Sequence, residues 1–501
     1  MAAWLVGRRQ AGVGAIAALV LGLVLPNGAS ALAGRSPRAG SGPGGGALSF
    51  GPFGEVAVYR PAGGEPKQVA LFVSGDGGWN QGVVDMAHHL AALGALVLGI
   101  DIRHYLAAAQ ARPGECFSAA ADFEALSQFA QKKLGLKQYR HPVLVGYSSG
   151  ATLVYGALAQ SPAATFRGAL SLGFCPDLPL ERPLCRGEGL RWGPGPKGKG
   201  VVFEPRTDLP DPWVAFQGQV DQVCSPAEVD RFAALAGKAQ VVKLPKVGHG
   251  FSVEANWLPQ FRESFLRLGE ARKEEVGGAG EGGPSLPEAE SSPGTSDLPL
   301  VEVPVRNGES PALAVMLSGD GGWAGLDKEV ASRLAGRGVP VVGWSSLLYY
   351  WTPRTPESSA ADLARVLRHY LAAWHRERVV LVGYSLGADV LPFLVNRLPA
   401  DLRSRVSAVV LIGVSSTANF EFHVSDWLGG GDHGPAVLPE ASKLSVPKVL
   451  CLYGEHEKDS LCHQLKGEPF QAVPLAGGHH FGGDYDAVAG HILSGLGLAL
   501  P

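Results

Sequence analysis

The sequence predicts an α/β protein made of two tandem domains, each a mostly parallel sheet flanked by helices. The first observation is a repeat. LFVSGDGGW at residues 71–79 returns as VMLSGDGGW at 315–323, and VLVGYSSG at 143–150 returns as VLVGYSLG at 380–387. A fixed order of motifs that recurs along a chain marks homologous domains. The second observation is that the apolar runs are short and continuous, which is typical of strands buried on both faces of a parallel sheet.

Five such runs mark the expected strands of each copy, in matching order. They are 69–73, 96–100, 143–145, 169–172 and 214–216 in the first copy, and 314–317, 339–342, 379–382, 408–412 and 449–452 in the second. The segments between them have helical spacing: Asp362, Val366 and Tyr370 recur at every fourth position, so they share one face of a helix. Strands that alternate with helices favour a doubly wound parallel sheet in each copy.

The composition is that of a globular protein. The chain has 501 residues, enough for two or three domains with full cores. Hydrophobic residues make up 46% and charged residues 18%, which argues against disorder. The formal net charge of −3 excludes a global basic field that would draw the protein to nucleic acid, although a local basic patch stays open.

Residues 1–31 have the features of a signal peptide. Arg8 and Arg9 precede an apolar stretch of small residues at 11–25, and the sequence ASA at 29–31 fits an A-x-A cleavage site. The stretch is shorter than the roughly 20 residues of a membrane-spanning helix, with an uncleaved anchor as the alternative. We therefore expect an exported protein, periplasmic if the cell has an outer membrane.

Composition also sets the expected domain boundaries. Residues 271–298 combine charge with Gly, Pro and Ser, which is typical of a flexible linker. The sequence thus predicts an N-terminal α/β domain at 47–270, a linker at 271–298 and a C-terminal α/β domain at 299–501.

Six cysteines fit an oxidising compartment. The second copy holds two, so Cys451–Cys462 is the only disulfide that it can form internally. The first copy holds four, which allow three connectivities. We favour Cys175–Cys185 together with Cys116–Cys224. Free buried cysteines are the alternative.

The repeated G-x-S-x-G motif lies between a strand and a helix. In the second copy the run 379–382 leads into GYSLG and then into a helical segment, the context in which this motif forms a nucleophile elbow. The glycines leave room for strained backbone geometry around the serine. The serine then lies at a helix N-terminus, where backbone N–H groups can hold developing negative charge. We therefore expect two α/β-hydrolase folds with Ser148 and Ser385 as nucleophiles.

A serine nucleophile needs a base and an acid that orients the base, and in this fold they follow in the order serine, acid, histidine. Each copy has an acid in a D-x-x-C frame and a histidine in a G-H-x-F frame. The candidates are Ser148, Asp221 and His249 in the first copy, and Ser385, Asp459 and His479 in the second. The histidine frame favours His479 over His480. Glu455 or Glu457 stays open as the acid in place of Asp459.

The SGDGGW loops follow an early strand, where this fold provides the second N–H group of the oxyanion hole. We assign the holes to the backbone around Asp76, Gly77 and Ser149 in the first copy, and around Asp320, Gly321 and Leu386 in the second. A glycine-rich turn with a packing tryptophan is the alternative. The loops lack the nucleotide-binding lysine and glycine spacing. No His and Cys cluster has metal-ligand spacing, so we expect neither a metal nor another cofactor.

Five segments of the second copy resemble a known family: SGDGGWAGLD (318–327), YYWTPRTPE (349–357), VLVGYSLGADVLPFLVNRLP (380–399), FEFHVSDWLG (420–429) and LYGEHEKDSLC (452–462). They resemble the AcvB/VirJ family of bacterial virulence proteins. The layout of signal peptide, N-terminal copy, linker and C-terminal domain resembles the longer AcvB-like members. Residues 345–348 depart from the expected pattern because they lack an Asp.

The resemblance implies an exported serine hydrolase that cleaves the aminoacyl ester of aminoacyl-phosphatidylglycerol, chiefly the lysyl form. Its partners would be the lipid headgroup at the membrane surface and proteins of type IV secretion, not nucleic acid. Arg354 is a candidate for the lipid phosphate, because a guanidinium binds phosphate with two hydrogen bonds, or else forms a surface ion pair. Tyr350 and Trp351 are candidates for contact with the membrane interface. Asp389 is a candidate for the ammonium of the amino acid, or else makes a structural hydrogen bond.

The second copy is expected to be the main catalyst. The first copy keeps its serine, acid and histidine, and is either a second active site or a substrate-presenting domain. Two other functions stay open: a non-catalytic periplasmic binding or assembly factor for type IV secretion, and a generic esterase or lipase. The complete sets of catalytic residues favour the hydrolase over the assembly factor.

Overall fold

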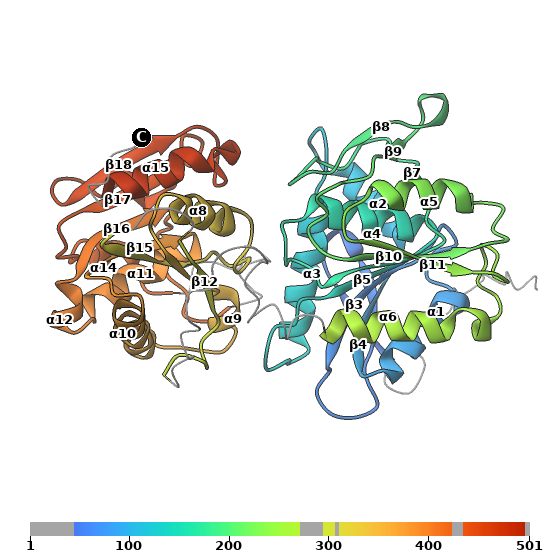
Figure 1. The fold of residues 1–501 in the computed structure, drawn as a ribbon, viewed down its shortest axis with the longest axis horizontal. Coiled ribbons are helices and arrows are strands. Elements are labelled where there is room, and N and C mark those ends of the chain that lie inside the picture. The colour runs from blue at the N-terminus through green and yellow to red at the C-terminus, as the bar shows by residue number, and fades with distance from the viewer. Residues whose placement is uncertain (1–44, 271–293, 306–309, 423–433, 496–501) are drawn as a thin grey trace, which may run out of the picture. The chain divides into compact units, whose positions relative to one another are not determined.

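The computed structural model describes residues 45–270, 294–305, 310–422 and 434–495. The predicted signal peptide and residues 271–293 of the predicted linker lie outside this part of the chain. Each copy of the repeat forms its own large sheet, with helices on both faces (Figure 1). The predicted α/β architecture of parallel sheets flanked by helices is therefore confirmed.

The first copy forms an eight-stranded sheet in the order β1-β2-β4-β3-β5-β6-β10-β11. Only the pairings of β1 with β2 and of β2 with β4 are antiparallel. A small sheet, β7-β9-β8, lies in the insertion after β6. The strands are β1 (Gly45–Ser49), β2 (Glu55–Tyr59), β3 (Gln68–Val73), β4 (Ala95–Ile100), β5 (Val143–Tyr147), β6 (Gly168–Leu172), β7 (Asp177–Leu178), β8 (Trp192–Pro194), β9 (Val201–Phe203), β10 (Trp213–Gly218) and β11 (Ala239–Leu244). The α-helices are α1 (Gln81–Ala92), α2 (Ile102–Ala111), α3 (Ala119–Lys133), α4 (Ser149–Gln160), α5 (Pro226–Leu235) and α6 (Leu258–Glu270).

The second copy forms a seven-stranded sheet in the order β12-β14-β13-β15-β16-β17-β18, in which only β12 runs antiparallel to its neighbour. The strands are β12 (Leu300–Val303), β13 (Ala312–Leu317), β14 (Val341–Trp344), β15 (Arg378–Tyr384), β16 (Val406–Ile412), β17 (Val449–Gly454) and β18 (Phe470–Leu475). The α-helices are α8 (Gly325–Gly336), α9 (Ser346–Tyr349), α10 (Pro356–Ala373), α11 (Leu386–Asn396), α12 (Ala400–Arg403), α14 (Val437–Ala441) and α15 (Tyr485–Gly495).

The central strands are buried on both faces, as their continuous apolar sequences require. Along β3, Val69, Leu71 and Val73 pack into the core on one face, and Ala70 and Phe72 pack into the core on the other. In β13 the same alternation divides the strand between two cores of the second copy. Because side chains alternate across a strand, helices must cover both faces of each sheet.

Each nucleophile motif forms a sharp turn between a central strand and a helix. Ser148 lies between β5 and α4 with φ 55° and ψ −124°, and Ser385 lies between β15 and α11 with φ 52° and ψ −119°. These backbone angles are strained for a residue with a side chain. The turn also brings main chains together: a Cβ atom on Gly146 would lie 2.2 Å from the carbonyl oxygen of Gly150. The glycines of the motif are therefore required by space.

This close approach leads to a prediction about stability. Gly146→Ala places a methyl group against the backbone of α4, so we expect it to lower the free energy of unfolding by about 1–3 kcal/mol, as overpacking does. Gly193→Ala is the matched control, because a Cβ atom there meets nothing within 4 Å. Denaturant unfolding of both variants measures the difference, and equal stability of the two would contradict the tight elbow.

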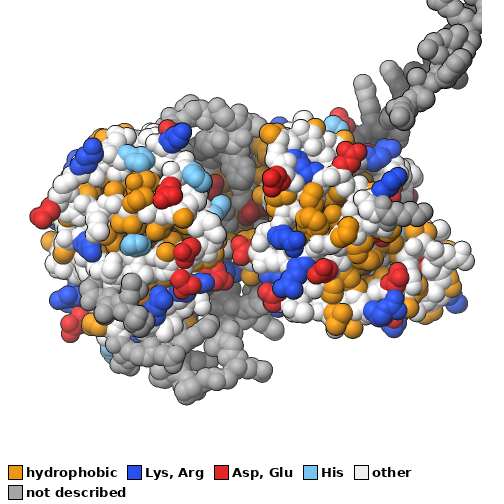
Figure 2. Space-filling view, turned by 90° about the horizontal axis from the view of Figure 1, so that it is seen from above, with side chains coloured by type: hydrophobic (Ala, Val, Ile, Leu, Met, Phe, Trp, Pro, Cys, Tyr) orange, Lys and Arg blue, Asp and Glu red, His pale blue; other side chains and the backbone are white. Residues whose placement is uncertain are grey.

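The surface shows charges of both signs intermixed with small apolar areas on the face seen in Figure 2. This agrees with the small net charge of the chain. Within the described residues, no helix combines the length and the hydropathy needed to span a bilayer.

Candidate active sites

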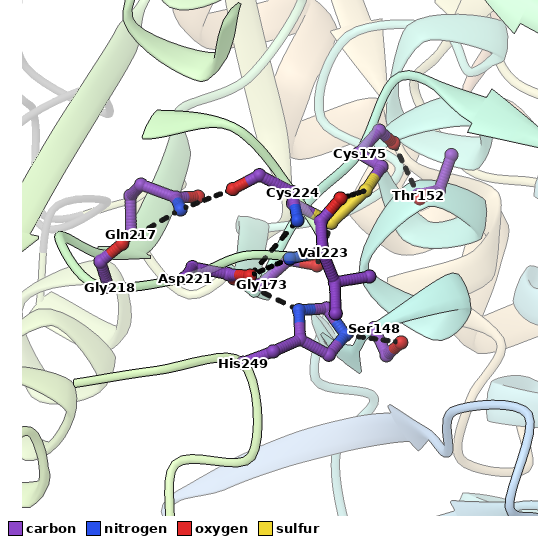
Figure 3. The surroundings of a disulfide bond; sticks show 10 residues. All are labelled: Ser148, Thr152, Gly173, Cys175, Gln217, Gly218, Asp221, Val223, Cys224 and His249. Atoms are coloured by element: carbon purple, nitrogen blue, oxygen red, sulfur yellow. Dashed lines mark hydrogen bonds and ion pairs between the residues drawn. A yellow bond between two sulfur atoms is a disulfide. The ribbon is translucent and has the colours of Figure 1, made fainter. Parts of the chain in front are cut away.

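The first copy brings its predicted serine, histidine and aspartate into one hydrogen-bonded chain. The Oγ atom of Ser148 lies 2.9 Å from Nε2 of His249, and Nδ1 of His249 lies 2.9 Å from Oδ2 of Asp221. The three residues follow β5, β11 and β10, so they meet at the carboxyl edge of the parallel sheet. Figure 3 shows the imidazole between the other two side chains. This is the geometry that lets a histidine remove a proton from a serine.

The carboxylate of Asp221 is fixed on both of its oxygens. Its side chain has no exposed surface, and Oδ1 accepts hydrogen bonds from the backbone N–H groups of Val223 and Cys224 at 2.8 and 3.0 Å. The hydroxyl of Tyr147 donates to the carbonyl oxygen of His249 at 3.1 Å. Burial, together with the nearby Asp221 charge, raises the pKa of Tyr147, so the phenol stays a donor. These contacts hold the imidazole in a defined orientation.

The glycine-rich loop of the first copy lies beside the serine. A cavity of about 250 Å³ is lined by Ser148 and Tyr147, by residues 75–78 of the loop, and by Asn80 and Val83. Ser149 is the first residue of α4, and its N–H has no acceptor within hydrogen-bond distance in the described segments. The structure thus places Asp76, Gly77 and Ser149 around the serine, although their role in an oxyanion hole stays a prediction.

The second copy has the same elbow and a histidine–acid pair, but the hydroxyl of its serine is not hydrogen-bonded to the histidine. Nδ1 of His479 lies 2.5 Å from Oε1 of Glu457, and the hydroxyl of Tyr384 donates to the carbonyl oxygen of His479 at 3.3 Å. The hydroxyl of Ser385 makes no hydrogen bond to any described residue. Of the two hydrogen bonds that connect serine, histidine and acid in the first copy, the second copy therefore has only the one between histidine and acid.

The favoured acid Asp459 is wrong, and Glu457, one of the two alternatives left open, is the partner of His479. Glu457 lies at the third position after Gly454, the last residue of β17, just as Asp221 lies at the third position after Gly218 of β10. In both copies the acid's N–H donates to the carbonyl oxygen of that glycine. Asp459 is exposed on the longer loop that leads to Cys462. Counting from the strand-ending glycine, rather than back from the cysteine, identifies the acid.

His480 has a different environment from His479. Its Nδ1 lies 2.9 Å from the hydroxyl of Tyr384. Burial lowers the pKa of His480, and the neighbouring His479 lowers it further, which favours the neutral ring. Because the phenol already donates to the carbonyl oxygen of His479, Nδ1–H of His480 is the donor to the phenol oxygen. His479, which contacts the acid, is the histidine placed to act as the base.

The GDGG loop of the second copy repeats the turn of the first. The N–H of Gly322 donates to Gly319, as that of Gly78 donates to Gly75. Asp320 is exposed on this loop, and Leu386 begins α11 directly after the serine. The backbone assignment to Asp320, Gly321 and Leu386 stays a prediction.

The aromatic pair predicted to meet the membrane is part of the core, so this expectation is wrong. Tyr350 is 1% exposed and Trp351 is 2% exposed. Tyr350 packs edge-on against Tyr349 and Phe420, and Trp351 stacks on Phe422. The physical reason is that a run of aromatic residues suits a core as well as an interface.

Arg354 and Asp389 each have a structural contact. The exposed guanidinium of Arg354 lies 4.5 Å from the ring centre of Tyr349, a cation–π contact that leaves its outer edge to solvent. Asp389 is buried, and one of its oxygens accepts a hydrogen bond from the N–H of Ser415 at 2.6 Å. The structural hydrogen bond left open for Asp389 is present. The ligand roles of both residues stay predictions.

Three disulfides lie in the described part of the chain: Cys116–Cys185, Cys175–Cys224 and Cys451–Cys462. The pairing predicted for the second copy is confirmed, and the pairing predicted for the first is wrong. A bridge between Phe117 and Leu184 brings Cys116 beside Cys185, and the adjacency of β6 and β10 brings Cys175 beside Cys224. Such disulfides indicate folding in an oxidising compartment, as in exported proteins.

Metal-type ligand atoms gather at one place within the described residues. Atoms of Asp221, Cys224 and His249 lie within 4.8 Å of one another. The sulfur of Cys224 forms a disulfide with Cys175, and the side chains of Asp221 and His249 are hydrogen-bonded to each other. The group is therefore accounted for by the disulfide and the serine–histidine–aspartate chain.

Comparison with solved structures finds matches at low sequence identity and low TM-score. An esterase domain from Rhodothermus marinus is 16% identical, and covers 44% of this chain and 98% of its own, with a TM-score of 0.31. A lidless α/β serine hydrolase from Xanthomonas campestris is 22% identical, with coverages of 46% and 94% and a TM-score of 0.31. An esterase from Thermogutta terrifontis is 17% identical, with coverages of 48% and 97% and a TM-score of 0.32.

A search of curated proteins finds no match to this chain. The family model for the bacterial virulence protein VirJ matches residues 67–171 and 311–499, which together make up more than half of the chain. The matched segments include both GDGGW loops and both serine elbows. The chain therefore belongs to the VirJ family of bacterial virulence proteins.

Proposed function

We propose that the protein is a serine hydrolase of carboxylic esters, with a complete site in the first copy and a second site in the second copy. The observation that carries this proposal is the chain from Ser148 through His249 to Asp221, which starts at a strained elbow. A strained backbone at a serine, and a buried carboxylate next to an imidazole, both cost stability. Such features cluster at active sites, where they serve catalysis.

The proposed reaction proceeds through an acyl-enzyme. Ser148 Oγ attacks the ester carbonyl while His249 Nε2 takes its proton, and Asp221 holds the imidazole and stabilises its charged form. The N–H of Ser149 and the GDGG loop face the developing oxyanion. The imidazolium then gives its proton to the departing alcohol. Water, activated by the same imidazole, releases the acid and restores the serine.

The second site would use Ser385, His479 and Glu457 in the same roles. A glutamate serves as the acid in this fold as well as an aspartate does. The unbonded hydroxyl of Ser385 is compatible with activity, because catalytic hydrogen bonds often tighten only when substrate binds. Both sites would therefore turn over, with the first already assembled.

For the substrate we propose the aminoacyl ester of aminoacyl-phosphatidylglycerol, with the lysyl form favoured. Membership of the VirJ family supports this substrate, because the resemblance to that family implies an aminoacyl-phosphatidylglycerol hydrolase. The cavity beside Ser148 supports it independently, since Asp76 lines the cavity, is exposed and makes no ion pair with any described residue. A carboxylate next to an oxyanion site is unfavourable unless a cation accompanies the substrate. The free ammonium of an aminoacyl ester supplies that cation.

Asp76→Asn tests this charge pairing. In a Ser385→Ala background, we expect kcat/KM for an alanine p-nitrophenyl ester to fall about tenfold, since roughly 1.4 kcal/mol of attraction is lost. The rate for the N-acetylated ester should stay level or rise. Asp85→Asn, an exposed carboxylate on α1, is the charge control. An equal fall for both esters would show that Asp76 does not select the ammonium.

The proposed location is the periplasm, with residues 1–31 acting as a cleaved signal peptide. The three disulfides support export, because such bonds persist in oxidising compartments. Arg354 is proposed for the lipid phosphate, since its guanidinium is exposed.

A hydrolysis panel tests the proposed function. Lipid extracts containing lysyl- and alanyl-phosphatidylglycerol are incubated with the wild type, Ser148→Ala, Ser385→Ala and the double variant, and the released amino acid is measured. We expect release by the wild type and none by the double variant. Undiminished release by the double variant would refute the serine mechanism. Cleavage of simple esters, with no release of amino acid from either lipid, would indicate a generic esterase.

A further inference from the structure

The acid of the first site lies on a turn that is tied to the rest of the domain by a disulfide. Asp221 lies between Gly218, the end of β10, and Cys224, which precedes α5. Two N–H groups orient its carboxylate, and one of them belongs to Cys224. Cys224 is bonded to Cys175 on the loop after β6 (Figure 3). The position of a donor to the catalytic acid is thus set by a covalent bond.

The same disulfide reaches the helix that carries the serine. The carbonyl oxygen of Cys175 accepts a hydrogen bond of 2.7 Å from the hydroxyl of Thr152, which lies one turn after Ser148 on α4. The sulfur of Cys224 also lies 3.5 Å from the carbonyl oxygen of Gly173, at the start of the same loop. A continuous connection therefore runs from Asp221 through the disulfide and Thr152 to the nucleophile helix.

The second copy keeps the cysteine on the acid loop but anchors it elsewhere. Cys462 bonds to Cys451, which lies within β17, the strand that precedes the acid itself. The position that corresponds to Cys175, two residues after the loop glycine, is Ser415, whose N–H donates to Asp389. The serine of this copy makes no hydrogen bond to the described histidine. In the first copy a disulfide joins the acid loop to the loop after the neighbouring strand β6. This is also the copy in which the serine, histidine and acid are connected by hydrogen bonds.

We propose that the Cys175–Cys224 disulfide is a positioning element, which fixes Asp221 relative to Ser148 so that His249 bridges them. This inference rests on the proposed hydrolase function. The first site should therefore lose reactivity when this disulfide is removed, even where the domain stays folded. The other disulfide of the same copy, Cys116–Cys185, makes no contact with the three catalytic residues among the described contacts, and serves as the matched control.

The test measures the rate at which a fluorophosphonate labels Ser148 in a Ser385→Ala background. We expect the Cys175→Ser/Cys224→Ser variant to be labelled about 10- to 100-fold more slowly, the effect of a small misplacement of catalytic groups. Cys116→Ser/Cys185→Ser should stay within about threefold of the parent on the same reasoning. Equal rates for the two cystine variants would overturn the proposal.

A second measurement reads the position of Asp221 without any chemistry. A histidine N–H bonded to a carboxylate gives a downfield proton resonance, and His249→Asn identifies the one from the first site. We expect this signal to vanish in Cys175→Ser/Cys224→Ser and to persist in Cys116→Ser/Cys185→Ser. Its persistence in both would overturn the positioning role. Absence of labelling in the parent, with the resonance behaving as expected, would count against the hydrolase and not against the tether.

Thr152→Val covers the case in which the cystine variant does not fold. This nearly isosteric change removes the hydrogen bond to Cys175 and leaves the disulfide intact. We expect labelling about fivefold slower, in line with the loss of one buried hydrogen bond. An unchanged rate would contradict the connection between the disulfide and the nucleophile helix.

Discussion

Ser148→Ala in a Ser385→Ala background is expected to lower ester hydrolysis by about 10³-fold or more, to the level left by binding and the oxyanion site alone. The physical reason is that the hydroxyl, the imidazole and the buried carboxylate act as one unit, so removing the nucleophile removes the acyl-enzyme route. The loss should appear in kcat. Steady-state hydrolysis of an aminoacyl p-nitrophenyl ester measures it.

Ser149→Ala is the matched control for this variant. Its hydroxyl is buried without a hydrogen-bond partner among the described residues, so its removal costs the fold little. The backbone N–H proposed for the oxyanion hole is retained. We expect activity within about threefold of the parent, as for a change that leaves every catalytic group in place. A similar loss in both variants would point to damage at the elbow and not to a missing nucleophile.

Glu457→Gln in a Ser148→Ala background is expected to slow the second site by about 10²- to 10⁴-fold, as when the acid of such a unit loses its charge. The substituted amide side chain would keep the size of the glutamate but could no longer stabilise the imidazolium of His479. The rate of fluorophosphonate labelling at Ser385 measures the effect.

Asp459→Asn provides the comparison, because it lies on the same loop and is exposed. It should leave labelling of Ser385 within about threefold of the parent, since it does not contact the histidine. If Asp459→Asn lost activity and Glu457→Gln kept it, the acid inferred from the D-x-x-C frame would be the correct one.

The elbow and the sheets could be predicted because local sequence dictates them. Strands such as β3 and β13 are buried on both faces, so their sequences are continuously apolar. The glycines around Ser148 and Ser385 are forced by backbone contacts of a few ångströms. Such requirements can be seen in one short segment of sequence.

The edge strands could not be predicted by the same criterion. β11, β12 and β18 lie at the ends of their sheets, and nearly all of their residues are partly or fully exposed, so their sequences are not continuous apolar runs. The predicted run 339–342 begins two residues before β14, because Val339 and Pro340 are apolar but precede the strand.

The disulfide pairing of the first copy and the acid of the second copy depend on distances in the folded protein. The number of residues between two positions in the sequence does not give these distances. Cys175 meets Cys224 because β6 and β10 are neighbours, an adjacency set by the order of the whole sheet. The acid loop of the second copy is longer between the acid and the cysteine, so a frame anchored on Cys462 points to Asp459 instead of Glu457. In both cases the strand ends set the positions, and separation along the chain does not.

The most direct test of the two-site hydrolase is the location of fluorophosphonate adducts on the wild-type protein, found by mass spectrometry of its peptides. We predict an adduct on the peptide containing Ser148, lost in His249→Asn, with a second adduct on the peptide containing Ser385. A protein that carries no adduct at Ser148, or one whose labelling there is unchanged by His249→Asn, would contradict it.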